Sequence, residues 1–261
     1  MSSFIFTYAI YRIFTIISYM QNLIGKKVLI TGAAYRLGRV IALVAARYGA
    51  DILLHHGHSP DEAEQTANEI RKLGRECFIF QADLQNTASL EKLIADATAH
   101  EPFYCLVNNA SIFPPGGIQE TDLATWQQCL DVNLTAPFLL SQAFIRSHNA
   151  GNPGRIINIL DWRALRPGID HFAYTISKAG LAALTQSTAR AGAPNVTVNA
   201  LALGAILPPV NEPPDERLIA QIPLKRWATL DEFEEAILFL LRAPAFINGE
   251  IIHLDGGRHI V

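Results

Sequence analysis

The feature that most constrains the fold is a regular alternation of short, unbroken apolar runs with stretches of helical periodicity, which begins at Lys26. Seven runs lack the polar alternation of a half-exposed strand, and a segment long enough for a helix separates each from the next. They span 28–30, 52–54, 77–80, 105–107, 156–159, 196–201 and 251–254. Strands that are apolar on both sides require helices on both faces of a parallel sheet. The sequence therefore predicts an α/β fold: one doubly wound domain over residues 26–261, with a seven-stranded parallel sheet.

Local signals mark where several helices begin and end. Ser59 is expected as the N-cap before Pro60, in a helix that ends near Gly74. Thr229 with Glu232 has the spacing of a capping box before the last long helix. Four prolines within residues 204–214 forbid regular strand pairing and predict a long loop there.

Composition excludes several classes of protein. Half of the residues are apolar, which is too many for a disordered chain, and the net charge of −3 with 17% charged residues does not suit a nucleic-acid binder. Cys77, Cys105 and Cys129 are too few and too scattered for a disulfide framework. We interpret them as small buried side chains in a reducing compartment, and expect a cytoplasmic protein.

Residues 1–25 form an N-terminal extension of unusual composition. Its first 20 residues are rich in Phe, Ile and Tyr, with Arg12 as their only charge, and the uncharged stretches beside Arg12 are too short for a membrane span. The first 20 residues also do not show the charged start, apolar middle and small-residue cleavage site of a secretory signal in that order. Two interpretations stay open: an interfacial or packing segment, or a translation start at Met20. We expect neither a membrane nor a nucleic acid among the partners of the protein.

The first predicted strand runs into the sequence TGAAYRLG, Thr31 to Gly38, which opens the first helix. Gly32 and Gly38 would let the backbone approach a pyrophosphate, whose negative charge the helix N-terminus would meet. Two glycines that merely form a tight turn are the alternative interpretation of this motif.

Further polar residues follow later strands in a definite order. Asp83 follows the third strand, Asn109 and Ala110 the fourth, and Asn133 lies in the next helix. Tyr174 and Lys178 are spaced i, i+4, which puts phenol and ammonium on one helical face, where the cation is expected to lower the phenol pKa. With Asp255-Gly256-Gly257 near the end, this order resembles the short-chain dehydrogenase/reductase family from Lys26 onward, and implies a Rossmann-like fold.

Within that family the chain resembles the pteridine reductases. Arg36 stands where the general family has the middle glycine of its Gly-rich loop, and Asp161 stands where the general family has a serine. Ser111 and Phe113 after Asn109-Ala110 also resemble the pteridine reductases, and the tail DGGRH, residues 255–259, resembles the bacterial dihydromonapterin reductases. After the sixth strand the chain has Leu203-Gly204, where the family usually has Pro-Gly. This difference affects the expected shape of the loop that follows, but not the expected reaction.

The resemblance implies roles for these residues. The catalytic residues would be Asp161, Tyr174, Lys178 and Asn133, with Tyr174 and Lys178 as the proton-donating pair and Asn133 holding a water that connects Lys178 to solvent. Cofactor contacts would come from Gly32, Arg36, Leu37, Gly38, His58, Ser59, Asp83, Asn109, Ala110, Ser111, Tyr174 and Lys178. Substrate contacts would come from Arg36, Ser111, Phe113, Asp161 and Tyr174, with the Phe113 ring stacked on the pterin.

Each assignment has a structural alternative. Asp161 could cap a turn or pair with Arg163 or Arg166, Phe113 could pack the loop beside two prolines, and Arg36 could be a solvated residue at a helix start. A further histidine group, His55, His56 and His58, has the composition of a metal cluster. It lacks supporting Cys or carboxylate ligands, so we expect no metal.

The end of the second strand indicates the cofactor. An acid normally accepts hydrogen bonds from the ribose hydroxyls of NAD there, but this stretch has none before Asp61. Its polar donors suit a 2′-phosphate, and by similarity to the pteridine reductases we place His58, Ser59 and Arg36 around it. The expected cofactor is NADPH.

These features predict an NADPH-dependent reductase that takes a dihydropterin, such as dihydromonapterin or dihydrofolate, to the tetrahydro form. Which pterin is physiological, and whether oxidised pterins are accepted, stays open. The alternatives are a reductase of ketones such as 3-oxoacyl thioesters, and a nucleotide-binding regulator without turnover. The resemblance also implies a homotetramer, in which Arg258 of the tail could reach a neighbouring subunit's site.

Overall fold

The computed structural model describes residues 23–100, 103–149, 151–208 and 216–261. The predicted extension up to residue 22, the possible start at Met20 and most of the proline-rich loop lie outside the described residues. Leu23 is fully buried in the core, and its backbone N–H donates to the carbonyl of Tyr48 (3.3 Å). The chain therefore packs against the domain before the boundary that the sequence placed at Lys26.

All seven predicted apolar runs lie in strands of one parallel sheet, which confirms the predicted fold class. The strand order is β3-β2-β1-β4-β5-β6-β7, as in a doubly wound fold. The strands are β1 (Lys27–Ile30), β2 (Asp51–His56), β3 (Cys77–Gln81), β4 (Cys105–Asn108), β5 (Gly154–Asp161), β6 (Val196–Leu203) and β7 (Ile251–Leu254).

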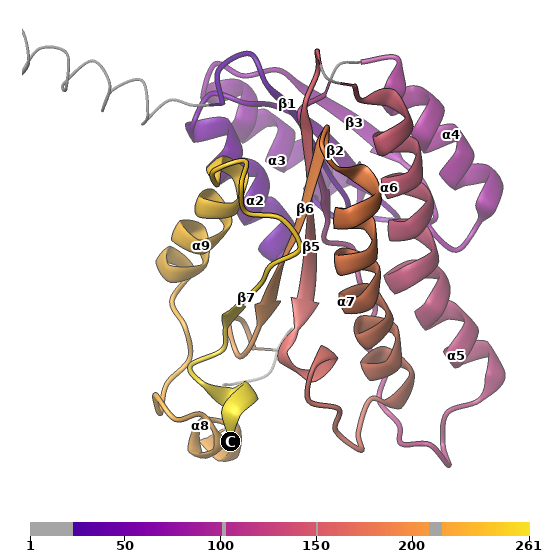
Figure 1. The fold of residues 1–261 in the computed structure, drawn as a ribbon, viewed down its shortest axis with the longest axis vertical. Helices are drawn as coiled ribbons and strands as arrows, with labels where there is room; N and C mark the ends of the chain where they lie inside the picture. The colour runs from indigo at the N-terminus through magenta and orange to yellow at the C-terminus, as the bar shows by residue number, and fades with distance from the viewer. Residues whose placement is uncertain (1–22, 101–102, 150, 209–215) are drawn as a thin grey trace, which may run out of the picture.

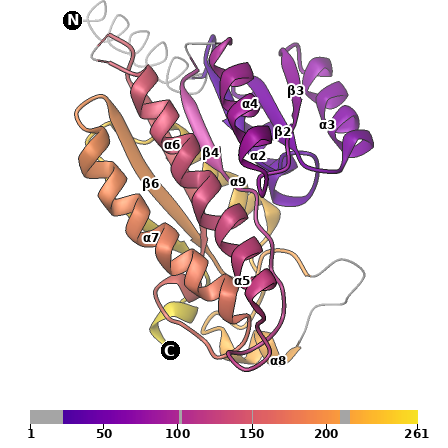
Figure 2. The ribbon, with the colours of Figure 1, turned by 90° about the vertical axis from the view of Figure 1, so that its right-hand side faces the viewer.

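Helices cover both faces of this sheet, as Figures 1 and 2 show. One face is covered by α2 (Arg36–Arg47), α3 (Pro60–Lys72) and α9 (Leu230–Arg242). The opposite face is covered by α4 (Thr87–Thr98), α5 (Leu123–Leu130), α6 (Ala136–Ser147) and α7 (Phe172–Gly192). Each face has its own buried hydrophobic cluster, as expected for strands that are apolar on both sides.

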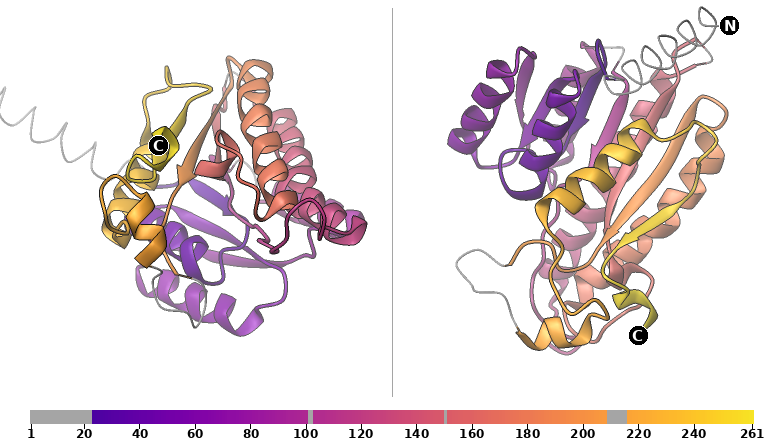
Figure 3. Two further views of the ribbon diagram at one scale, coloured as in Figure 1. Left: turned by 90° about the horizontal axis from the view of Figure 1, so that it is seen from below. Right: turned by 90° about the vertical axis from the view of Figure 1, so that its left-hand side faces the viewer.

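Short helical segments lie near the carboxyl edge of the sheet, seen from below in Figure 3, or interrupt longer helices. They are a π-helical turn η1 (Asp131–Thr135) between α5 and α6, a 3-10 turn η2 (Trp162–Ala164) after β5, α8 (Glu216–Gln221) and a C-terminal 3-10 turn η3 (Arg258–Ile260). Asn133 thus lies in a π-turn and not in a regular α-helix, a type of bulge that often occurs at functional sites.

The predicted helix signals agree with the structure in most details. Thr229 and Glu232 form both hydrogen bonds of a capping box at the start of α9. Ser59 is the N-cap of α3, with Pro60 in the first turn, but its side chain accepts no capping hydrogen bond. The hydroxyl of Ser59 is therefore available to a ligand at this helix end.

β5 and β6 extend beyond their predicted ends, and this brings Asp161 into register with Leu203 at the carboxyl edge of the sheet. The departure from Pro-Gly leaves β6 intact, because Leu203 pairs with Leu254 and the Gly204 N–H donates to the Leu254 carbonyl (2.9 Å). A Cβ atom at Gly204 would lie 2.7 Å from Cα of Asp255, so this position still requires glycine.

Cys77, Cys105 and Cys129 are buried free thiols, as predicted. Within the described ranges, no helix combines the length and the apolar character that crossing a membrane would require.

Candidate active site

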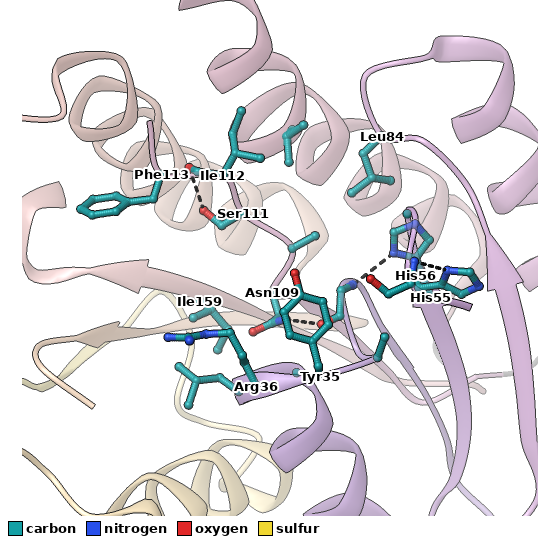
Figure 4. A pocket seen from close by; sticks show the side chains of 18 of the residues that line it. Tyr35, Arg36, His55, His56, Leu84, Asn109, Ser111, Ile112, Phe113 and Ile159 are labelled. Carbon is teal, nitrogen blue, oxygen red and sulfur yellow. Dashed lines mark hydrogen bonds between the residues drawn. The ribbon is translucent and has the colours of Figure 1, made fainter. Parts of the chain in front are cut away.

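A cavity of about 530 Å³ opens at the carboxyl ends of the central strands, and Figure 4 shows part of its lining. Its volume lies within the usual range for small-molecule and cofactor sites. The site residues predicted from the sequence line this cavity, except for Asn133, which is fully buried beside it. Those that line it are Gly32, Arg36, Leu37, Gly38, His58, Ser59, Asp83, Asn109, Ala110, Ser111, Phe113, Asp161, Tyr174 and Lys178.

The turn between β1 and α2 is held against the end of β4 by hydrogen bonds. The Thr31 hydroxyl accepts from the backbone N–H groups of Asn109 and Ala110, both at 3.0 Å. The Asn109 side-chain amide donates to the carbonyls of Thr31 (2.8 Å) and Gly32 (3.1 Å). Asn109 therefore fixes the shape of this turn from the neighbouring strand end.

Glycine is required at both ends of this turn. Gly32 has a φ of +64°, which disfavours any side chain. A Cβ atom at Gly38 would lie 2.0 Å from the Gly32 carbonyl oxygen and 2.7 Å from the Asn109 amide nitrogen. This close backbone approach leaves a cradle without side chains at the N-terminus of α2, which fits the pyrophosphate of a dinucleotide.

His55 has a structural role that the sequence did not reveal. Its buried ring accepts from the Gly32 N–H at Nδ1 (3.1 Å), and Nε2 lies 3.0 Å from the Ala82 carbonyl, to which it donates. Burial lowers the His55 pKa to about 4, so the ring is neutral near pH 7. Among the described residues, no group of three or more His, Cys, Asp or Glu side chains is placed to hold a metal ion.

Arg36 lines the cavity, and its side chain is held on the side of β6. Its backbone has a φ of 53°, and its guanidinium donates to the carbonyl of Pro208 (2.9 Å), beyond the end of β6. Figure 4 shows this side chain directed away from His55 and His56 at the end of β2. The guanidinium thus lies away from His58 and Ser59, because the sheet order places β6 and β2 on opposite sides of β1. The contact of Arg36 with a 2′-phosphate stays a prediction.

Asp161 uses its two carboxylate oxygens for different contacts. Oδ1 accepts from the backbone N–H of Arg163 (2.8 Å) and thereby caps η2. Oδ2 accepts from the Tyr174 hydroxyl at 3.2 Å. The Arg163 guanidinium lies 3.9 Å from Oδ1 and forms a closer ion pair with Asp170 (2.9 Å). The capping alternative for Asp161 is thus correct for one oxygen, and the other faces the predicted proton donor.

Burial dominates the protonation of this group. Burial raises the pKa of Asp161. The hydrogen bond from the Arg163 backbone N–H and the positive charge of the Arg163 guanidinium both lower it, but by less. Burial also raises the pKa of Tyr174 well above its usual value, and the negative charge of Asp161 raises it further. The expectation that Lys178 brings the phenol pKa below its usual value is therefore wrong, because burial and Asp161 raise it. Both acidic groups hold their protons more tightly than usual.

Lys178 is buried behind Tyr174. Its Nζ donates to the carbonyl of Ile159 (2.8 Å) and lies 5.7 Å from the Tyr174 ring centroid. Burial lowers its pKa to about 8, opposed by the charge of Asp161. The ammonium form therefore prevails below about pH 8 and is lost above it.

The side chain of Asn133 is held by the protein. Its amide group donates to the Ile112 carbonyl and the Ser177 hydroxyl, both at 3.0 Å, while its oxygen accepts from the Ile112 N–H (2.9 Å) and the Ser111 hydroxyl (3.1 Å). Asn133 thus ties the loop after β4 to α7, which carries Tyr174 and Lys178.

Phe113 lies at the mouth of the cavity with 49% of its surface exposed. Its ring stacks on His171 (centroids 3.7 Å apart, planes 11° apart) and meets Tyr174 edge-on at 4.5 Å. The ring of His171, a residue that the sequence analysis missed, also bonds the Pro114 carbonyl (2.8 Å). Phe113 therefore both packs its loop and borders the space beside Tyr174.

Arg258, predicted to reach a neighbouring subunit, packs within its own chain in this structure. It is 7% exposed, its guanidinium lies 4.2 Å from the centroid of the Trp162 ring, and it donates to the Gln221 side chain (3.0 Å). The tail thus packs against the turn that follows Asp161.

We expect Gly38→Ala to abolish detectable NADP⁺ binding, because the added methyl group collides with the Gly32 carbonyl. Calorimetric titration measures the affinity. Gly57→Ala is the matched control in the same cavity, since its Cβ would approach no atom closer than 3.9 Å. Binding by folded Gly38→Ala with unchanged affinity would contradict the proposed cradle.

Comparison with known proteins agrees with this geometry. Residues 26–218 match the family model described as short chain dehydrogenase. The 3-oxoacyl-[acyl-carrier-protein] reductase FabG of Aquifex aeolicus is 33% identical over 241 residues, covering 89% of this chain and 97% of that protein. Nodulation protein G of a Rhizobium species is 34% identical over 245 residues, covering 91% of this chain and 98% of that protein.

A solved structure of similar shape is FolM alternative dihydrofolate reductase 1 from Brucella canis, complexed with NADP. It superposes with a TM-score of 0.85 at 33% sequence identity, over 93% of this chain and 96% of that one. With the family match over residues 26–218, these relationships show that the chain belongs to the short-chain dehydrogenase/reductase family of oxidoreductases.

Proposed function

We propose that the protein is an NADPH-dependent reductase of a pterin, which takes a dihydropterin such as dihydromonapterin or dihydrofolate to its tetrahydro form. The observation that carries this proposal is the 3.2 Å hydrogen bond between the Tyr174 hydroxyl and Asp161 Oδ2 in the cavity. A carboxyl group here suits protonation of a ring nitrogen, whereas ketone reduction needs a neutral donor to a developing alkoxide. The similarity to FolM from Brucella canis supports the same substrate class.

The residues of the cavity fit NADPH. The cradle formed by Gly32 and Gly38 suits the pyrophosphate, and the end of β2 offers His58 and Ser59, without an acid, where an NAD enzyme holds its ribose. Asp83 and Ala110 also line the cavity. Lys178 and Tyr174 line it on the side where the nicotinamide would lie. When bound there, NADPH would supply a hydride to the carbon of the substrate's C=N bond.

The chain's own residues would supply the proton. Burial raises the pKa of Asp161, so its carboxyl group can hold a proton closer to neutral pH than an exposed aspartate can. Asp161 would pass this proton to the ring nitrogen, and the Tyr174 hydroxyl would replace it across their hydrogen bond. The Lys178 ammonium, 5.7 Å from the Tyr174 ring centroid, would offset the negative charge that then develops.

The other predicted substrate contacts border the same space. Phe113 presents an aromatic surface beside Tyr174, although His171 stacks on its ring. Ser111 is exposed to the cavity, and Arg36 reaches toward its Pro208 side. These groups would border the flat, polar ring of a pterin. Arg36 would donate a hydrogen bond to the oxygen of that ring or to the pyrophosphate of the cofactor.

A reductase of 3-oxoacyl thioesters is the second candidate. It is supported by the similarity to the FabG reductase of Aquifex aeolicus, at 33% identity. Asp161 and Phe113 separate the two candidates, because neither is needed to protonate an alkoxide. A regulator without turnover is less well supported, since the contacts among Asp161, Tyr174 and Lys178 are intact.

Asp161→Asn tests the proposal, because it keeps the size of the side chain and removes the acid. We expect kcat for a dihydropterin to fall about a hundredfold or more, the usual scale of general acid catalysis, with NADPH affinity retained. Tyr174→Phe should be similarly damaging. The double variant should lose much less than the product of the two effects, because both residues serve one proton transfer.

Asp161→Ser is the matched comparison, since it introduces the serine of the general family. We expect Asp161→Ser to lose dihydropterin reduction as Asp161→Asn does, although it has the serine of the general family. If folded Asp161→Asn reduced a dihydropterin near the original rate, Asp161 would be a capping residue only and ketone reduction would become the better proposal.

We also propose that the protein is a cytoplasmic homotetramer, as its family resemblance implies. Several apolar side chains on α5, α6 and α7 are exposed in the single chain, among them Leu123 (79%), Phe138 (44%) and Ile176 (36%). Light scattering at micromolar concentration should give the mass of four chains, and the mass of one chain would contradict this.

A further inference from the structure

The guanidinium of Arg163 lies between two carboxylates, one of which belongs to the proposed proton donor. Its Nη2 donates to Oδ2 of Asp170 at 2.9 Å, whereas its Nη1 lies 3.9 Å from Oδ1 of Asp161. The first distance is that of a charge-assisted hydrogen bond, and the second is about 1 Å too long for one. Arg163 therefore pairs fully with Asp170 and only incompletely with Asp161.

The three side chains differ in their exposure to water. Arg163 is 13% exposed and Asp161 18%, whereas Asp170, on the loop between η2 and α7, is 56% exposed. Charges that are shielded from water interact more strongly than charges at the surface. A small change in the distance between Arg163 and Asp161 therefore matters more than an equal change at an exposed ion pair.

The other contacts of the Arg163 side chain leave its guanidinium free to turn. Its guanidinium carbon lies 5.0 Å from the centroid of the Trp162 ring and 5.7 Å from that of Phe113. Aromatic faces attract a cation without directing its N–H groups. The buried Nε of Arg163 makes no hydrogen bond to any described residue. The two carboxylates therefore decide the direction in which the guanidinium points.

We propose that Arg163 is a positioning residue for Asp161, and that Asp170 keeps its guanidinium from forming a close ion pair that would hold Asp161 ionised. The inference rests on the proposed function only in that Asp161 is taken to deliver a proton. The backbone N–H of Arg163 donates to Oδ1 of Asp161 (2.8 Å) whichever side chain stands at this position. The backbone of Arg163 thus fixes where the carboxyl group lies, and its side chain affects whether that group is protonated.

Other charged or titratable groups face Asp161 from two further elements. Tyr174 and Lys178 face it from α7, and Arg258 interacts with it from the C-terminal tail. The positive charges of Lys178 and Arg258 favour the ionised form of Asp161, as that of Arg163 does. Burial opposes them and is the largest cause of the raised pKa of Asp161. These groups stay in place when Arg163 or Asp170 is replaced, so a comparison of variants isolates the effect of the guanidinium.

The test measures the pKa of Asp161 by NMR, from the carboxyl carbon in protein labelled with ¹³C at aspartate, with Asp161→Asn to identify the signal. In Asp170→Asn the guanidinium is released toward Asp161, and we expect the pKa of Asp161 to fall by about one pH unit or more, the scale of a nearby opposite charge. Arg163→Gln removes the cation, so the pKa should rise by about one pH unit.

Arg166→Gln is the matched control. It removes another arginine of the same segment, one that is exposed and donates to the Arg258 carbonyl (3.5 Å). The pKa of Asp161 should change by less than about 0.3 pH unit in this variant, as expected for a charge screened by water.

A double variant separates the action of Asp170 through Arg163 from direct repulsion between the two acids. In a chain that already carries Arg163→Gln, the further change Asp170→Asn should leave the pKa of Asp161 nearly unchanged. An equal fall with and without Arg163 would overturn the inference, because Asp170 would then act by its own charge. An unchanged or raised pKa in folded Asp170→Asn would also overturn it.

The titration needs no substrate, so its outcome is independent of the proposed reaction. If the pKa changes as expected but no dihydropterin is reduced, only the proposed substrate is overturned. If a dihydropterin is reduced, kcat should decline at lower pH in Asp170→Asn than in the native protein and at higher pH in Arg163→Gln, because a general acid acts only while it is protonated. A decline at the same pH in all three proteins would overturn the inference.

Discussion

The turn from β1 into α2 forms only because two of its positions carry no side chain. At Gly38 the backbone comes so close to the Gly32 carbonyl that a Cβ atom would lie 2.0 Å from that oxygen. Asn109 and Thr31 hold the same turn against the end of β4, and His55 holds it against β2. Because three neighbouring strand ends meet at this turn, its shape sets the position of the cavity and of the side chains around it.

Removal from water is the second physical factor in the site. Asp161, Tyr174 and Lys178 lie in a buried group, and burial is the largest cause of the pKa shift of each. It favours the neutral form of every one of them, so the two acids keep their protons and the lysine loses its proton more easily. A buried carboxyl group that holds its proton more tightly than an exposed aspartate suits the proton transfer that we propose for Asp161.

The fold was predictable from the sequence because the strands are apolar on both faces and separated by helical segments, a pattern that only a covered parallel sheet satisfies. The cavity residues were predictable because parallel strands end at one edge, so residues that follow different strands converge there. Side-chain direction was not predictable. The contact of Arg36 with Pro208, the stacking of His171 on Phe113 and the rise in the Tyr174 pKa depend on segments far apart in the sequence.

Asp161 beside Tyr174, in a short-chain dehydrogenase fold, is the feature from which we propose pterin reduction. The most direct measurement is NADPH oxidation by the native protein with dihydromonapterin, dihydrobiopterin, dihydrofolate and a 3-oxoacyl thioester, compared side by side as kcat/KM. We expect turnover of at least one dihydropterin, with a higher kcat/KM than for the thioester. Turnover of the 3-oxoacyl thioester with none of any dihydropterin would contradict this expectation.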